Sequence, residues 1–173
     1  GGQIYHLSKL NPISSSYKKK LDEFFKSHQE YKVVHSHLDC MSGTPLKEAK
    51  KCHIPFRIAH AHSSNQTKDM KYPLKLIFKR NIVKNANYLF ACGDQAGKWM
   101  FNTDNFKVLN NAIDAKIYSF NFNYRTDIRD EFTIPTDSLV IGHVGRFMNP
   151  KNHTFIIDIF NQFHKNHPNS YLM

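Results

Sequence analysis

Two His-x-His pairs are the residues of this chain best suited to chemistry. They occupy residues 35–37 and 60–62, and each follows a short apolar run typical of a β-strand. Ligands of parallel α/β folds gather at the carboxyl ends of strands, so we expect these imidazoles to face a cleft. Alternate residues of an extended segment can both reach one zinc ion. Three interpretations remain open: a metal site, structural hydrogen-bonded histidines, and a catalytic or acceptor-binding role.

A second candidate site is the basic segment at residues 144–152. Gly145 allows a turn after a strand, and the cations Arg146 and Lys151 follow five residues apart, before a helical pattern begins. An arginine can bond two phosphate oxygens at once, and a lysine adds a point charge. The segment is therefore suited to binding a diphosphate, although a basic surface loop would have the same composition.

The elements that must position these residues alternate between strand and helix. Short apolar runs at 31–35, 56–59, 88–92, 106–109 and 138–144 predict strands, and the nearly continuous apolar character suits a buried parallel sheet. Stripes at helical spacing lie between them. The alternation predicts an α/β fold with right-handed crossovers.

The boundaries of these elements carry their own predictions. The expected N-cap of the first helix is one of Ser14 to Ser16, and those of later helices are Asp69, Asp94 and Thr154. Residues 1–5 and 171–173 are predicted to be further strand segments.

A change of composition divides the chain. Residues 110–136 contain asparagine pairs and a proline, with no long periodic run, which indicates a link between domains. We therefore expect one domain at 1–115, and a linker with the first βα unit of a second domain at 116–173. A single βα unit cannot cover both faces of a sheet, so the second domain is expected to be incomplete.

Composition and charge limit the class of protein. Hydrophobic residues make up 40% of the chain, and no apolar run has the length of a membrane span. The formal net charge of +10 favours anionic partners such as phosphate-bearing substrates, nucleic acid or a membrane face. Three cysteines without metal-like spacing indicate free thiols in a reducing compartment.

Five segments in this order resemble the family-4-type retaining glycosyltransferases of capsule, exopolysaccharide and lipopolysaccharide assembly in bacteria. They are His-Ser-His at 35–37, Ile-Ala-His-Ala-His-Ser at 58–63, Phe-Ala-Cys-Gly at 90–93, Leu-Asn-Asn-Ala-Ile-Asp at 109–114, and Val-Gly-Arg-Phe at 144–147 with Lys-Asn-His at 151–153. The resemblance implies the GT-B arrangement of two Rossmann-like domains. The chain would hold most of the N-terminal, acceptor-side domain and the start of the C-terminal, nucleotide-sugar-binding domain.

The resemblance also implies roles for individual residues. Arg146 and Lys151 match the pair that contacts the donor diphosphate and stabilises the leaving nucleoside diphosphate without a metal. His62 matches the histidine beside the reacting sugar, with His60 as a competitor because this loop holds one extra residue. No metal or cofactor is expected, and the nucleoside diphosphate sugar is a co-substrate.

At the level of the whole protein, the resemblance implies transfer of a hexose or similar sugar, with retention, to a lipid-linked or growing polysaccharide. The expected location is cytoplasmic, with peripheral contact to the anionic inner face of the plasma membrane. The family's glycine-rich loop and glutamate segment are absent, so the chain is expected to be an inactive fragment. The alternatives are a metal-dependent hydrolase built on the His-x-His pairs and a basic nucleic-acid-binding module; no recognition motif supports the latter.

Overall fold

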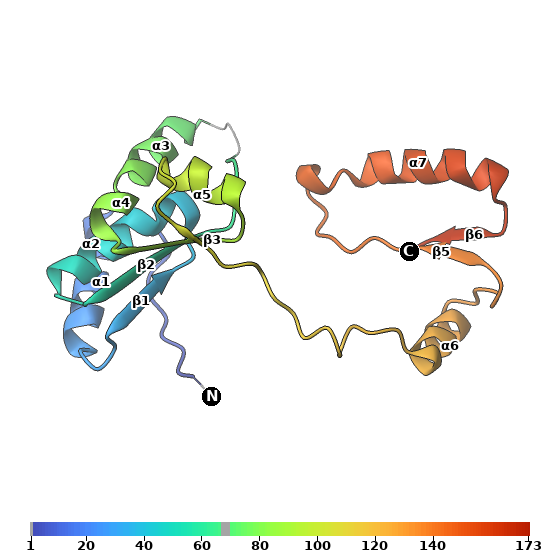
Figure 1. The fold of residues 1–173 in the computed structure, drawn as a ribbon, viewed down its shortest axis with the longest axis horizontal. Helices are drawn as coiled ribbons and strands as arrows, with labels where there is room; N and C mark the ends of the chain where they lie inside the picture. Colours follow the sequence, from blue (N-terminus) through green and yellow to red (C-terminus); the bar gives the residue numbers. More distant parts are fainter. Residues whose placement is uncertain (1, 67–69) are drawn as a thin grey trace. The chain divides into compact units, whose positions relative to one another are not determined.

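The computed structural model describes residues 2–66 and 70–173, which form two compact units. Unit 1 is Gly1–Ile113 and unit 2 is Asp114–Met173 (Figure 1). Within the described residues, no helix is long and apolar enough to cross a membrane.

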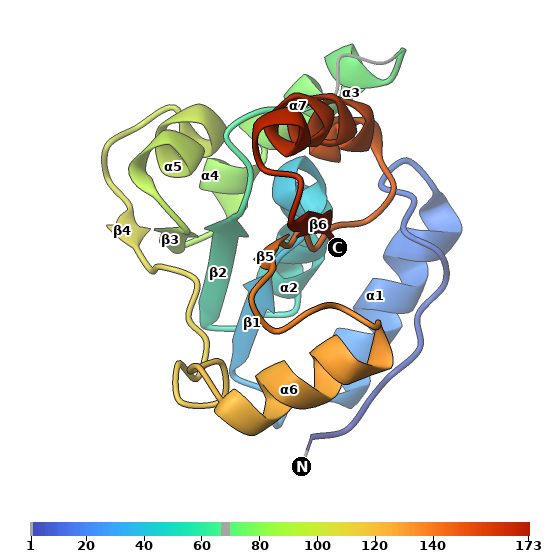
Figure 2. The ribbon, with the colours of Figure 1, turned by 90° about the vertical axis from the view of Figure 1, so that its right-hand side faces the viewer.

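Unit 1 is built on a four-stranded parallel sheet. Its strands are β1 (Val33–Ser36), β2 (Phe56–Ala61), β3 (Tyr88–Ala91) and β4 (Lys107–Val108), in the spatial order β1-β2-β3-β4. The arrows of β1 and β2 lie next to one another and point the same way in Figure 2. This arrangement confirms the predicted α/β fold with a parallel sheet.

The helices of unit 1 pack against one face of this sheet. They are α1 (Ser15–Ser27), the 3₁₀ turn η1 (Asp39–Ser42), α2 (Gly43–Lys51), α3 (Tyr72–Arg80), α4 (Ile82–Asn85) and α5 (Asp94–Phe101). Strands that lie side by side in chain order, joined by crossovers of one hand, place their helices on the same face. Ala59 and Ala91 of the sheet accordingly form one core with Leu46, Ile82 and Met100 of the helices.

The opposite face of the sheet has no such cover from the described residues of unit 1. Strand side chains alternate between faces, so His35 and His60 point away from the core that their neighbours form. Val33, Phe56 and Tyr88 are 52%, 44% and 45% exposed. This open face is where the histidine pairs lie.

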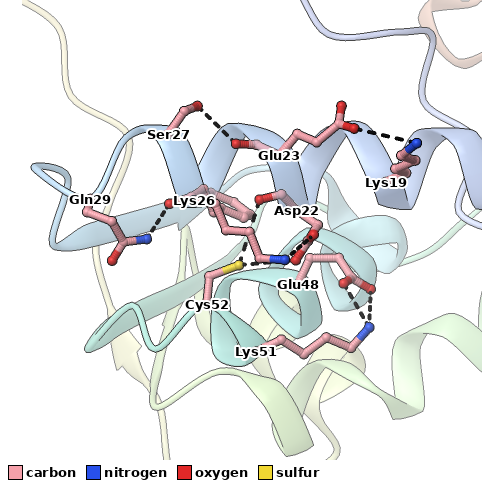
Figure 3. A network of polar contacts seen from close by, with 10 residues as sticks. Lys19, Asp22, Glu23, Lys26, Ser27, Gln29, Glu48, Lys51 and Cys52 are labelled. Atoms are coloured by element: carbon pink, nitrogen blue, oxygen red, sulfur yellow. Dashed lines mark hydrogen bonds and ion pairs between the residues drawn. The ribbon is translucent and has the colours of Figure 1, made fainter.

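A second apolar cluster lies between α1 and α2, and a network of polar contacts borders it (Figure 3). The thiol of Cys52, just after α2, donates to Asp22 Oδ1 at 3.5 Å, and Lys26 Nζ lies 2.7 Å from the other oxygen of that carboxylate. The hydrogen bond from Lys26 lowers the pKa of Asp22. The buried carboxylate of Glu48 is paired with Lys51 at 2.8 Å, which offsets the cost of its desolvation.

Unit 2 contains a two-stranded parallel sheet with helices. Its elements are α6 (Phe122–Glu131), β5 (Leu139–Ile141), η2 (Asn149–Lys151), α7 (His153–Asn166) and β6 (Ser170–Leu172). β5 and β6 pair in register through Val140 and Tyr171, so the strand predicted at 171–173 is confirmed, one residue earlier. The buried guanidinium of Arg129 donates to the carbonyls of Pro135 and Ser138 at 2.6 and 2.9 Å, which fixes the turn into β5.

The helix starts in the structure agree only in part with those predicted from the sequence. Ser14 caps α1 as predicted, because its Oγ accepts from the backbone N–H of Tyr17 at 3.3 Å. The predicted cap Asp94 is instead the first residue of α5, and Gly93 occupies the cap position. A carboxylate in a first turn still favours the helix through its dipole. Asp69, the predicted cap of the next helix, lies outside the described residues.

The strand predicted at residues 1–5 is wrong for the described part, 2–5, which has no regular structure. Ile4 is 84% exposed, so its apolar side chain is not buried against a sheet. The ring of Tyr5 packs edge-on against Phe24 of α1, with centroids 5.2 Å apart. Side-chain contact with a helix, rather than strand pairing, anchors this segment.

Candidate functional site

The two His-x-His pairs come together at the carboxyl ends of neighbouring strands. β1 and β2 are paired in parallel, so the first histidine pair lies beside the second. His35 Nε2 lies 3.2 Å from His60 Nδ1, and His37 Nδ1 lies 2.7 Å from His62 Nε2. All four imidazoles therefore form one cluster, which we call the histidine cluster.

The environment of the histidine cluster favours the neutral form of three imidazoles, those of His35, His37 and His60. His60 is only 6% exposed, whereas the other three rings are exposed. Burial, with smaller contributions from the neighbouring imidazoles, lowers the pKa of His60 to about 4. Burial likewise lowers the pKa values of His35 and His37. Neutral rings retain a lone pair, so near pH 7 they can accept a proton or bind a metal.

His60 is unusual because one of its polar atoms is left over. Its Nε2 is buried and has no hydrogen-bond partner among the described residues. Whichever tautomer is drawn, the contact with His35 uses only Nδ1. A buried polar atom without a partner is costly, and Ser8 Oγ, Ser36 Oγ and His143 Nε2 share this state among the described residues.

Asp39 fixes the loop that carries His62. Its carboxylate accepts from the backbone N–H of His62 at 3.3 Å and from Ser63 Oγ at 3.0 Å. Asp39 has a φ of 46°, in the left-handed region that few side chains other than asparagine and aspartate tolerate. The sequence showed only that a carboxylate was nearby. No pattern there indicated that it binds a backbone amide rather than an imidazole.

The two candidate histidines of the second pair differ in access. His62 lines a cavity of about 380 Å³ together with Cys92, Gly93 and residues 94–96 at the start of α5. His60 is buried among the other rings and does not line this cavity. Access to a ligand thus favours His62 for contact with a substrate, and the role itself stays a prediction.

The basic segment lies in unit 2, between β5 and α7. A side chain at Gly145 would place its Cβ 3.3 Å from Lys151 Cγ, so the stem of that lysine lies over the glycine backbone. Arg146 and Lys151 are both exposed, and neither side chain makes a hydrogen bond or ion pair within the described ranges. The segment thus presents two free cations close to one turn of backbone.

The start of α7 adds donors to the basic segment. The helix begins at His153 with Asn152 as its cap, in place of the predicted cap Thr154, and no side chain of the described residues bonds its first N–H groups. Asn152 has a φ of 45°, which turns the chain sharply between Lys151 and the helix. A cavity of about 480 Å³ lies here, lined by 147–149 and 152–154. Free amides at a helix start attract anions.

Comparison with known proteins supports the resemblance that the motifs indicated. The chain is 28% identical over 170 residues to EpsF of Bacillus subtilis (strain 168), which carries the name of a glycosyltransferase; the match covers 92% of this chain and 44% of EpsF. No protein-family profile matches the chain. The likeness to EpsF confirms the predicted resemblance to glycosyltransferases, and the chain spans less than half the length of that relative.

Solved structures confirm the fold. HepE of Anabaena in complex with UDP superposes with a TM-score of 0.69 at 17% identity, covering 83% of this chain and 40% of HepE. HepE in complex with UDP-glucose gives a TM-score of 0.65 at 15% identity, with 82% and 40% covered. At this identity the likeness establishes the α/β fold and leaves function to the residues.

Proposed function

We propose that this chain is part of a retaining glycosyltransferase that moves a sugar from a nucleoside diphosphate sugar to a lipid-linked or growing polysaccharide. The observation that carries this proposal is the pair of free cations, Arg146 and Lys151, on the turn between β5 and α7. The name of EpsF and the nucleotides bound to HepE support the same class of reaction.

The basic segment would bind the diphosphate of the donor. Arg146 would bond two phosphate oxygens at once, and Lys151 would add a point charge beside the turn at Gly145. The free N–H groups at the start of α7 would contribute further donors. As the glycosidic bond to the donor breaks, negative charge grows on the leaving nucleoside diphosphate, and fixed cations stabilise that charge.

On the acceptor side, His62 would contact the reacting sugar or the acceptor hydroxyl. It faces the cavity of about 380 Å³ in unit 1, and Asp39 holds its backbone in place. His37 Nδ1 lies 2.7 Å from His62 Nε2, so the two rings fix each other's tautomers. His37 would thus act as a positioning residue for His62.

The donor site is tested by substitution in the full-length protein that contains this chain. A charge-assisted contact is worth about 1.5–3 kcal/mol, which corresponds to a loss of roughly 10- to 150-fold. Arg146→Ala and Lys151→Ala should each lower transfer from a nucleoside diphosphate sugar at least tenfold. Contacts that strengthen as the leaving group departs should lower kcat as well as raise KM.

The matched control is Lys165→Ala, which removes an exposed cation of α7 whose Nζ binds Gln162 instead of facing the basic segment. It should leave both kinetic parameters within twofold of the wild type. Wild-type kcat and KM in both Arg146→Ala and Lys151→Ala, with folding retained, would refute the diphosphate assignment.

Membrane contact is a separate part of the proposal. The formal net charge of +10 suits an anionic membrane face, where a lipid-linked acceptor would be presented. Sedimentation with vesicles should show binding to phosphatidylserine-containing vesicles at low salt and none to neutral phosphatidylcholine vesicles. Equal binding to both compositions would argue against an electrostatic contact.

A further inference from the structure

The histidine cluster has a second property that sugar transfer does not use. Its rings supply several nitrogen ligands at the ends of two adjacent strands, on the face of the sheet opposite the described helices of unit 1. The ligand atoms of His35, His37 and His60 all lie within 4.8 Å of one another. We propose that these three residues form a binding site for a divalent transition-metal ion of the zinc class.

The spacing of the ligand atoms supports this proposal. Zinc–nitrogen bonds of about 2.0–2.1 Å in tetrahedral geometry place two ligand nitrogens about 3.4 Å apart. His35 Nε2 and His60 Nδ1 are already 3.2 Å apart, close to the spacing of two ligands on one ion. The third ring, His37, lies one residue beyond β1, and its centroid is 4.1 Å from that of His35, so one edge of the sheet carries all three rings.

Burial and access both suit an ion. His60 anchors the site at the base, where its ring is only 6% exposed. His35 and His37 are exposed, so an ion can enter from solvent.

The chemistry of the ligands selects the class of metal. Three imidazoles suit zinc, copper, nickel and cobalt, whereas magnesium and calcium prefer oxygen ligands. The nearest carboxylate, Asp39, is engaged by the backbone of His62 and by Ser63. A fourth position is open to water, and His62 would support the site through its contact with His37.

The test measures metal binding directly, so its result does not depend on sugar transfer. The chain is stripped with a chelator and titrated with ZnCl₂ by calorimetry. One zinc ion should bind per chain, and MgCl₂ should give no binding. CoCl₂ should give the absorption of a tetrahedral site with nitrogen ligands and no thiolate charge-transfer band, which excludes the three cysteines as ligands.

Substitutions locate the ion. His35→Ala and His37→Ala remove exposed side chains, so the fold should persist in circular dichroism while zinc affinity falls at least tenfold in each. His28→Ala is the matched control: it removes a histidine of the same unit that pairs with Glu30, and it should bind zinc like the wild type. The proposal is overturned if the wild type binds no zinc at 100-fold molar excess, or if His35→Ala and His37→Ala bind it like the wild type.

Discussion

Gly97 in α5 offers a sharp test of the packing beside the cavity at His62. It is buried, and a Cβ at this position would lie 2.2–2.6 Å from three ring atoms of Phe106. Ordinary carbon contacts need about 3.5 Å, so the ring would have to move by more than ~1 Å. That ring packs near Phe101, with centroids 6.1 Å apart, which restricts its movement.

The net effect of Gly97→Ala follows from two opposing terms. Overpacking of this kind costs about 1–3 kcal/mol, and alanine improves a helix interior over glycine by about 1 kcal/mol. We therefore expect a net loss of about 1 kcal/mol in the free energy of unfolding. In a Phe106→Ala background the clash is gone, so the same change should stabilise unit 1 by up to about 1 kcal/mol. The coupling between the two sites is then about 2 kcal/mol.

Urea unfolding followed by tryptophan fluorescence measures this double-mutant cycle. The chain has one tryptophan, Trp99, and it lies in α5 itself, so the signal reports on unit 1. The reasoning is refuted if Gly97→Ala has the same effect in both backgrounds, or if it stabilises the chain while Phe106 is present.

Two further predictions concern titratable groups. Cys40 and Cys52 are buried, and burial raises the pKa of both thiols. A thiol reagent at pH 8 should therefore label the half-buried Cys92 first. Equal labelling rates at all three cysteines would contradict this prediction. The pKa of His60 is about 4 in the folded chain and near 6.5 when unfolded, so the unfolded state binds more protons between these values. In metal-free buffer, the urea midpoint of unfolding should therefore fall as the pH decreases from about 6.5 to 4, and it should fall less in His60→Gln. A wild-type midpoint that does not change over this range would contradict the low pKa of His60.

The sequence predicted the strands of unit 1 well because each lies in a short, mainly apolar run, and β1, β2 and β3 each bury at least one residue, although both residues of β4 are exposed. Its periodicity could not predict which strands are neighbours, so the contact between His35 and His60 became visible only with the pairing of β1 and β2. The starts of α5 and α7 were displaced by one and two residues, because neither cap residue bonds the first turn through its side chain and the expected capping residues lie inside the helices.

Two features had no signal in the sequence. Asp39 gave no sign of its left-handed backbone, because a single aspartate outside a recognised turn predicts no particular φ. Residues 2–5 carry the composition of a strand, yet strand formation needs a partner edge as well as propensity. Tertiary context decided both features.

The spatial order of the sheet also has a consequence for how unit 1 folds. Each strand pairs only with its neighbours in the chain, and the first registered pairs are Val33 with Phe56, Ile58 with Tyr88, and Phe90 with Lys107. These pairings close chain loops of moderate length, whose entropy cost grows only slowly with size. The sheet can therefore grow one strand at a time from β1, in the order in which a ribosome delivers the chain, with no strand waiting for a distant partner.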